Sequence, residues 1–419
     1  MEETNDTTDR TARLRLEPPV AEGQWLTLAA SLDDPEGKRH RLWWRVPAKW
    51  RHAVTTWADP FVVSFLFPMM RWGRPVFVEG KVSPSLLVNL EAFMAITHAW
   101  YPDKYVPVPI TAAEEVEPPP ATRPGEAVVA FSCGVDACFT VYRHHGGLMG
   151  RRSQRIGAAV VMHGFDIWLD EPRADEKYAG LLADAREILG NIGLEPTPMV
   201  SNFHELPTGW RHSVGTHLVG GLMLLQRAFD RALAAGCVPL PVLNVRWGNH
   251  PFTKPLLGSD RFRVLDDGYE VIRPDKIALL AEWPEALRRL RVCFENRDSH
   301  HNCCRCSKCI RTILAFRAAG VPLPESFEHD VTDRQIRNTR LDDEAFPGQW
   351  LWIVQWAKAH GRGNQSWMRA AVACVRRNRR RRRIKAFKRR FIPVRNALRR
   401  VFRGSPLSRR EGARRGQTN

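Results

Sequence analysis

The chain lacks long uninterrupted apolar runs, and its first residues lack the apolar core of a signal peptide. The opening segment, Met1–Asp6, is acidic and polar, and the apolar stretch Phe61–Met70 ends at Arg71, well short of the roughly 20 residues that cross a bilayer. We therefore expect a cytoplasmic protein without a transmembrane helix, soluble or at most peripheral to the inner face of the membrane. Without a secretion signal, its nine cysteines do not indicate a disulfide framework.

Outside its last segment, the chain also lacks an excess of charge of either sign. Residues 376–419 contain 17 Arg and two Lys against one acid, Glu411, and this net charge of +18 equals that of the whole chain. The preceding residues therefore sum to zero, and the basic character belongs to a tail. With 419 residues, 44% of them hydrophobic, the chain has material for two or three packed domains.

Residues 12–112 combine the alternating apolar pattern of strands with two helical segments. Residues 1–11 precede them as a disordered leader, and the proline-rich residues 113–126 follow as a linker. We expect an N-terminal α+β domain with strands and helices at Ala12–Leu16, Trp25–Ala30, His40–Val46, Pro60–Met70, Val76–Val82 and Pro84–Trp100.

From residue 127 onward, short continuous apolar runs alternate with amphipathic helices. We expect strands at Ala127–Phe131, Gly157–Met162 and Met199–Asn202, and helices at Glu176–Ile192 and Ser213–Ala235. This alternation is typical of an α/β fold with a parallel sheet covered on both faces. We place the α/β domain at 127–325, a Trp-rich helical extension at 326–375 and the basic tail at 376–419.

The first of these strands leads into a glycine-containing turn and a helix, with the sequence Ser132-Cys133-Gly134-Val135-Asp136-Ala137. A glycine allows tight backbone geometry, so that several N–H groups converge on an anion at the positive end of the helix dipole. Ser132 adds a hydroxyl group to such a site, and Asp136 provides a ligand for Mg²⁺ on a pyrophosphate group. The same residues also fit an ordinary strand–turn–helix junction.

Two further polar clusters are expected near this edge of the sheet. The second strand ends in Met162-His163-Gly164-Phe165-Asp166, and ligands of α/β proteins bind at the carboxyl ends of strands. A structural or capping histidine is the alternative for His163. Arg246–Pro251 fits a loop over the same edge, with Trp247 or His250 in contact with substrate, or equally a loop with a core-anchoring Trp and a surface His.

Cysteines with metal-ligand spacing form the most specific pattern in the chain. Cys303, Cys306 and Cys309 make two overlapping C-x2-C units, and Cys293 completes a set of four. Four thiolates suit a structural zinc ion with no open catalytic position. An iron–sulfur cluster and unmetallated buried cysteines are the alternatives. The neighbours Cys304, His300 and His301 are spare ligands, and nearby Arg305, Lys308 and Arg311 offset the charge of the thiolates.

The turn at 132–137 resembles the S-G-G-x-D-S loop of PP-loop ATP pyrophosphatases, from which it departs at Cys133, in place of Gly, and at Ala137, in place of Ser. The cysteine set, C-terminal to this loop and followed by Ile310-Arg311, resembles the zinc motif of the 7-cyano-7-deazaguanine synthase family within that superfamily. The resemblance covers roughly residues 128–320, and the N-terminal domain and the tail have no counterpart in it.

The resemblance implies a reaction class, cofactors and residue roles. An oxygen of a small-molecule carboxylate or carbonyl attacks the α-phosphate of ATP, pyrophosphate leaves, and a nucleophile then displaces AMP. Residues 132–137, with Ser132, Gly134 and Asp136 foremost, hold the phosphates and Mg²⁺; His163, Gly164 and Asp166 face the nucleotide, and Zn²⁺ shapes the wall of the site. The implied function is an ATP-dependent, AMP-forming ligase. A tRNA-modifying enzyme and a degenerate, non-catalytic scaffold stapled by zinc are the alternatives.

The basic tail has a helical repeat of apolar residues. Five consecutive arginines, Arg379–Arg383, precede apolar residues that recur every three or four positions, and Pro393 is expected to kink the helix. These apolar residues are Ile384, Phe387, Phe391, Val394, Leu398 and Val401. Such a helix fits an anionic membrane surface or the phosphates of a nucleic acid. A solvated, partly disordered tail is the third interpretation.

Overall fold

A computed structural model of the chain describes residues 11–240, 243, 246–293, 295, 299, 301–341 and 346–403; for 346, 386 and 388–403 it describes the backbone alone. The described part is an α/β structure built on one mixed, mostly parallel sheet of 11 strands. Nine of its strands are β1 (Ala12–Leu16), β3 (Trp25–Asp33), β4 (Arg39–Pro47), β5 (Val76–Val82), β6 (Ile110–Glu115), β7 (Arg123–Ala130), β8 (Arg155–His163), β9 (Pro196–Ser201) and β10 (Phe229–Ala235). The other two are β2 (Val20–Glu22) and β11 (Arg263–Asp267).

The C-terminal half of the sheet has the strand order of a doubly wound fold. Strands β11, β10, β7, β8 and β9 lie side by side in that order, and all four pairings are parallel. The chain starts in the middle at β7, moves outward through β8 to β9, and then returns to the other side of β7 for β10. Between β7 and β10 the direction of winding therefore reverses, and open α/β sheets bind ligands at the carboxyl ends of strands at such a point.

The N-terminal strands extend this same sheet. Strand β4 pairs antiparallel with β9, with Trp44 opposite Ser201 and Arg45 opposite Val200. The order then continues from β4 through β3, β1 and β5 to β6, with β2 on the edge of β3. The predicted linker 113–126 overlaps the end of β6 and the start of β7, so that a short connection at 116–122 separates the two strands.

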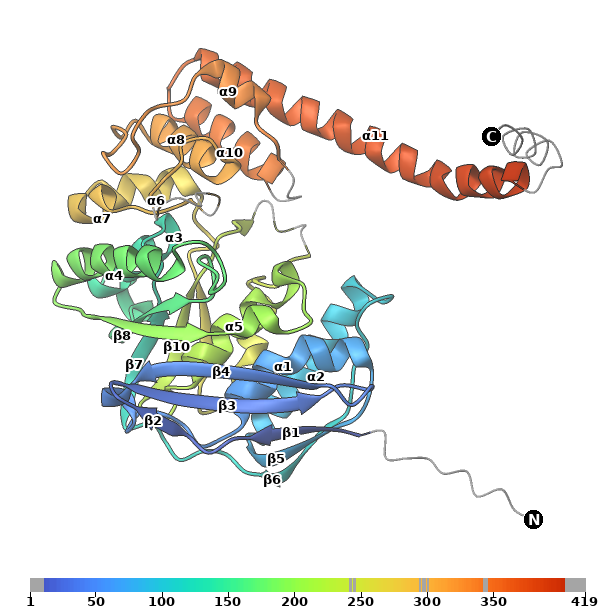
Figure 1. Ribbon diagram of the computed structural model, residues 1–419. Coiled ribbons are helices and arrows are strands. Elements are labelled where there is room, and N and C mark those ends of the chain that lie inside the picture. Colours follow the sequence, from blue (N-terminus) through green and yellow to red (C-terminus); the bar gives the residue numbers. More distant parts are fainter. Residues whose placement is uncertain are drawn as a thin grey trace, which may run out of the picture.

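Helices cover both faces of the sheet, as the continuous apolar strands predict. Alternate residues of β7 and β8 enter two different cores, with Val128 and Val160 on one face and Val129 and Val161 on the other. The first core contains helices α1 (Asp59–Trp72), α2 (Pro84–Trp100) and α5 (Trp210–Met223). The second contains α3 (Val135–His145), α4 (Ala174–Gly190), α6 (Arg273–Leu280), α7 (Pro284–Arg288), α8 (Ser307–Ala319), α9 (Asp333–Asn338), α10 (Phe346–Ala359) and the start of α11 (Ser366–Arg403). Figure 1 shows α6 to α10 gathered at one end of the molecule.

One prediction of secondary structure was wrong. The helix expected at Ser213–Ala235 ends at Met223, and its last seven residues form the buried strand β10. Alanine and leucine in Phe229–Ala235 favour a helix locally, but pairing with β7 and β11 on both sides makes this segment a strand. The helix predicted for the basic tail is present: α11 begins at Ser366, within the extension, and continues through Pro393 to Arg403.

Candidate phosphate-binding crevice and metal centre

The turn after β7 has the backbone geometry of an anion-binding loop. Cys133 has a positive φ of 56°, a conformation that glycine adopts at less cost, and Gly134 is extended where α3 begins. The N-cap residue, Gly134, has no side chain, so no cap hydrogen bond from it satisfies the first N–H groups of α3. Ser132 is exposed beside them, whereas Cys133 and Ala137 are buried. The start of α3 therefore presents backbone N–H donors and the positive end of a helix dipole.

Asp136, in the first turn of α3, lies between two cations of α6. Arg273 Nη2 and Lys276 Nζ each donate to a different carboxylate oxygen of Asp136, both at 2.8 Å. Burial alone would raise the pKa of this carboxyl, but Arg273 and Lys276 hold the pKa well below its usual range. Lys276 Nζ also donates to the carbonyl oxygen of Gly236, at 2.7 Å, just after β10. The ion pairs thus connect the segments that follow β7, β10 and β11.

These segments line a small crevice at the point where the strand order reverses. Its wall consists of Asp136, Cys237, Pro239, Val271, Ile272, Arg273, Lys276, Arg311, Gln349, Trp352 and Ile353. The cavity of about 20 Å³ has room for about one water molecule. Three cations and one carboxylate on this wall leave an excess of two positive charges, which favours an anion.

Helix α10 closes the crevice from the side opposite the sheet. Gln349 accepts a hydrogen bond from Arg311 of α8 and donates one to the carbonyl oxygen of Cys237, at 3.4 Å. Trp356 Nε1 donates to Asp275 of α6 at 2.7 Å. The helical extension is therefore part of the candidate site and does not stand apart from it.

The predicted residues at the end of β8 lie outside the crevice wall. His163 is 3% exposed and stacks on Tyr178 with ring centroids 4.4 Å apart, and burial lowers its pKa. Gly164 has a φ of 94°, and a Cβ there would lie 2.0 Å from the carbonyl oxygen of Ser201, so this position requires glycine. His163 therefore lies in the core against Tyr178, and its buried Nε2 has no hydrogen-bond partner among the described residues.

Asp166 forms a second charged group on the β8 side of the loop. Its carboxylate lies 3.7 Å from Arg291 Nη1. Burial would raise the pKa of Asp166, but Lys308 and Arg291 lower it. Arg291 also donates its backbone N–H to the carbonyl oxygen of Cys133, at 2.8 Å. Arg291 therefore joins the loop, through Cys133, to Asp166 and to the cysteine segment.

The loop at Arg246–Pro251 packs against the N-terminal half. The carbonyl oxygen of Arg246 accepts a hydrogen bond from the Tyr101 hydroxyl at 2.8 Å, and the His250 ring lies 5.1 Å from that of Trp100. Trp247 and His250 do not belong to the crevice wall. These contacts are those of a packed loop, and residues 241–242 and 244–245 just before it lie outside the described part of the chain.

The four cysteines predicted from their spacing lie together in a cluster that could hold a metal ion. The Sγ atoms of Cys293, Cys303, Cys306 and Cys309 all lie within 4.8 Å of one another. Two of these pairs, Cys293–Cys306 and Cys303–Cys309, are 3.9 and 4.0 Å apart. Zn–S bonds of about 2.3 Å in a tetrahedron place sulfur atoms about 3.8 Å apart. The cluster therefore has the size that a metal ion such as zinc requires.

Backbone amides support this cluster as they do in metal knuckles. Cys306 N and Arg305 N donate to Cys303 Sγ, at 3.3 and 3.4 Å, and Cys309 N donates to Cys306 Sγ at 3.3 Å.

The spare ligand candidates do not join the cluster. Cys304 has a φ of 53°, and its buried Sγ lies 3.7 Å from the carbonyl oxygen of Asn302. His301 is exposed and is not one of the four clustered residues, and His300 lies outside the described residues.

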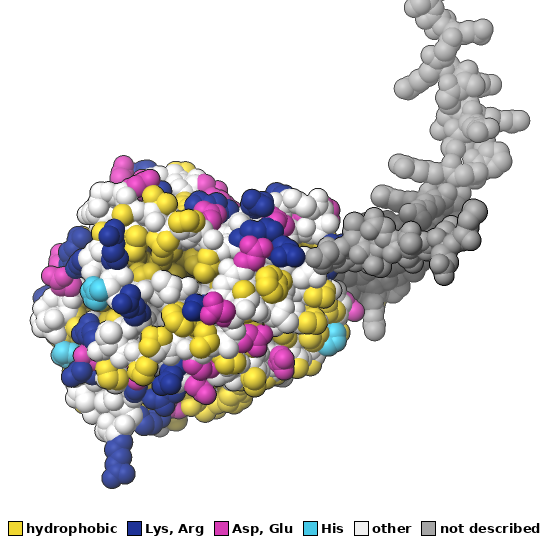
Figure 2. All heavy atoms as spheres, turned by 90° about the horizontal axis from the view of Figure 1, so that it is seen from below, with side chains coloured by type: hydrophobic (Ala, Val, Ile, Leu, Met, Phe, Trp, Pro, Cys, Tyr) yellow, Lys and Arg dark blue, Asp and Glu magenta, His cyan; other side chains and the backbone are white. Residues whose placement is uncertain are grey.

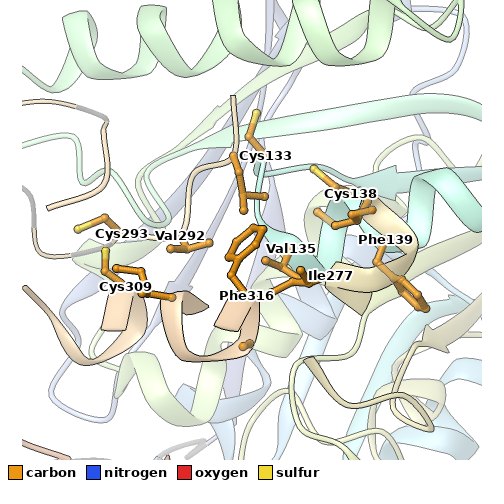
Figure 3. Packing of buried hydrophobic residues seen from close by; sticks show 14 of the residues in the cluster. Cys133, Val135, Cys138, Phe139, Ile277, Val292, Cys293, Cys309 and Phe316 are labelled. Atoms are coloured by element: carbon orange, nitrogen blue, oxygen red, sulfur yellow. The ribbon is translucent and has the colours of Figure 1, made fainter. Parts of the chain in front are cut away.

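The metal centre and the loop belong to one packed unit. Figure 3 shows Cys133 and Val135 of the loop, Ile277 of α6 and Phe316 of α8 in the same buried cluster as Cys293 and Cys309. Asn302 secures the cysteine segment, because its Oδ1 accepts from the backbone N–H groups of Val292 and Cys293, at 2.8 and 3.1 Å.

Sequence reasoning missed Arg273, Lys276 and Asn302. The first two stand three positions apart at the start of α6, a spacing that puts both on one helix face. Two cations on one helix face indicate a binding site only if the preceding strand ends at the same edge of the sheet. That strand is β11, which was not predicted from the sequence.

Comparisons with known proteins assign no family to this chain: no protein-family model, no curated protein and no solved structure matches it.

Proposed function

We propose that the chain is an ATP-dependent, AMP-forming ligase that activates a carboxylate or carbonyl group of a small molecule, with the phosphates of ATP bound at the crevice. One observation carries the proposal: Asp136, in the first turn of α3, and the cations Arg273, Lys276 and Arg311 line one crevice where the strand order reverses. Backbone donors, a helix dipole and an excess of two positive charges together favour a polyphosphate. The resemblance of residues 132–137 to the PP-loop supports the same ligand.

The residues of the chain would act by positioning and by neutralising charge. Bound ATP would supply an α-phosphate open to attack by a substrate oxygen, with pyrophosphate as the leaving group. Arg273, Lys276 and Arg311 would offset the charge that builds up on that leaving group, and the first N–H groups of α3 would hold its oxygens. Ser132, exposed at the mouth of the loop, would donate its hydroxyl to a phosphate oxygen.

The crevice wall does not fit a magnesium ion held by protein ligands. Asp136 is the one carboxylate on the wall, and both of its oxygens already accept hydrogen bonds from Arg273 and Lys276. Mg²⁺ prefers six oxygen ligands in an octahedron. We therefore assign Asp136 the role of positioning the two cations, in place of the Mg²⁺ ligand predicted from the sequence.

A nucleotide requires more room than this conformation offers. The cavity of about 20 Å³ is closed by Gln349, Trp352 and Ile353 of α10. Binding would therefore displace α10 from Arg311 and Cys237, and the hydrogen bonds of Gln349 would be replaced by contacts with phosphate. The Cys293–Cys309 cluster, with four sulfurs and no open position, would hold Zn²⁺ in a purely structural role.

Titration calorimetry of ATP, with and without Mg²⁺, into the zinc-loaded full chain tests the proposal. Lys276→Gln and Arg273→Gln should each weaken ATP binding by about ten- to a hundred-fold, because each removes a charge-assisted contact. Arg288→Gln, in α7 with an exposed side chain that pairs with Glu285, is the matched control and should leave binding unchanged.

Product analysis then distinguishes an AMP-forming reaction from one that releases ADP. With a mixture of carboxylic acids and an amine, the proposal requires AMP and pyrophosphate, and release of ADP would contradict it. Absence of ATP binding to a chain that retains zinc would leave the non-catalytic scaffold as the function.

A further inference from the structure

Helix α11 is a long basic arm that extends from the body. Its 38 residues form one helix from Ser366 to Arg403, and Figure 1 shows it leaving the α8–α10 end of the molecule. The helix contains no Asp or Glu. Seven cations within ten residues of it have exposed side chains: Arg376, Arg377, Arg379, Arg380, Arg381, Arg383 and Lys385.

The base of the arm is fixed to the body. Ala370, Ala371 and Cys374 are fully buried. Asn378 accepts a hydrogen bond from the N–H of Leu341, at 3.1 Å, and donates one to the carbonyl oxygen of Thr339, at 3.0 Å. Because its base is packed into the body, the helix leaves the molecule at a defined point, and the part beyond the base projects from there.

The body does not share the charge of the arm. The residues before 376 carry no net charge in sum, and Figure 2, which views the body from the end opposite α8–α10, shows Lys and Arg interspersed with Asp and Glu over that face. A polyanion would therefore be attracted to the arm and not to a broad basic surface around it.

The arm also exposes apolar side chains where it leaves the body. Ile384 is 47% exposed and Phe387 is 63% exposed, and their spacing of three places them on one side of the helix. In the sequence, the same spacing continues to Val401, whereas basic residues fill positions between. Phosphate contacts with a nucleic acid need no apolar side, but a helix at a lipid interface does.

We propose that α11, beyond its buried base, binds an anionic lipid bilayer as an interfacial helix. Ile384 and Phe387 enter the boundary between headgroups and acyl chains, and the exposed arginines contact lipid phosphates. The crevice and its loop would then be held near the membrane surface. The inference does not depend on the proposed reaction, since it concerns a different part of the chain.

Vesicle flotation of the zinc-loaded full chain tests this proposal. The chain should float with phosphatidylglycerol vesicles but not with phosphatidylcholine vesicles, and salt should weaken the binding. Changing Arg379–Arg383 to Gln should lower the partition coefficient by at least about a hundred-fold. The matched variant with five Lys keeps the charge and should bind within about three-fold of the original chain.

A second pair of variants tests the apolar side. Ile384→Ser with Phe387→Ser should lower binding about ten-fold or more. Val88→Ser, at a 66% exposed position of α2, makes the same kind of change on the body and should have no effect. Binding that depends on the arginines but not on Ile384 and Phe387 would refute an interfacial helix. A shift of RNA without flotation would also overturn the proposal and assign the arm to nucleic acid, and so would the absence of both.

Discussion

Replacing Asp136 with Asn tests whether the cations of the crevice favour an anion. The side chains of Arg273 and Lys276 are 8% and 3% exposed, so that each depends on the Asp136 carboxylate for compensation. Removal of one partner from a buried ion pair costs about 3–5 kcal/mol. For a chain of this size, that loss corresponds to a decrease in Tm of about 4 °C.

The same substitution should increase the affinity for an anion. Pyrophosphate can then supply the negative charge that the carboxylate supplied, so the Asn variant should bind it at least about ten-fold more tightly than the original chain. At a hundred times the Kd, the anion should restore about 2.7 kcal/mol of stability. Differential scanning calorimetry, with and without pyrophosphate, measures both effects.

Asp33→Asn is the control for this experiment. Asp33 also lies between two arginines, Arg15 and Arg39, at 2.6 and 2.9 Å, but this group is on the surface. Its loss should cost less than about 1 kcal/mol and should not change pyrophosphate binding. Equal destabilisation by the two substitutions, or weaker pyrophosphate binding to the Asp136→Asn variant, would refute the interpretation of the crevice.

Three other predictions follow from local geometry. Cys306→Ser should abolish binding of one zinc ion per chain, measured by elemental analysis, whereas Cys304→Ser should retain it. Asp59 is buried, and this burial raises its pKa to about 6 from 3.8. The free energy of unfolding that depends on the protonated carboxyl is therefore complete below pH 3.8 and is lost as the pH rises through 6. The loss amounts to about 3 kcal/mol in denaturant titrations, and Asp59→Asn should remove this pH dependence. Gly164→Ala should cost more than about 3 kcal/mol because of its positive φ and the contact with Ser201, whereas Gly190→Ala, in open space on a helix, should stabilise the chain by up to about 1 kcal/mol.

The cysteine cluster was predictable because most of its members are close together in the sequence. Three of the four cysteines lie within seven consecutive residues, and the hydrogen bonds from the backbone to sulfur form within the same turn. The spacing alone therefore determines that these thiols meet. Asn302, which holds the segment in place, has no such signature, since a single asparagine between cysteines has no distinctive pattern.

The crevice was only partly predictable because its charges come from distant parts of the chain. Asp136 could be found from the turn after β7, but Arg273 and Lys276 stand 137 and 140 residues further on. Their position depends on β10 and β11. The alanines of β10 have a high helix propensity, so this segment was predicted as a helix. Only pairing with neighbouring strands determines the conformation of Phe229–Ala235, and such pairing is not visible in a local pattern.

Because the two halves of the chain share one sheet, removal of the N-terminal half would expose surfaces of the C-terminal half. Strand β9 has its outer edge covered by β4, and 12 of the 14 residues of α1 are buried. A fragment that starts at β7 would leave unpaired N–H and C=O groups along β9 and a bare apolar patch over α5, both of which invite self-association. The first hundred residues therefore cover both the β9 edge and the apolar face of α5 in the C-terminal half of the sheet.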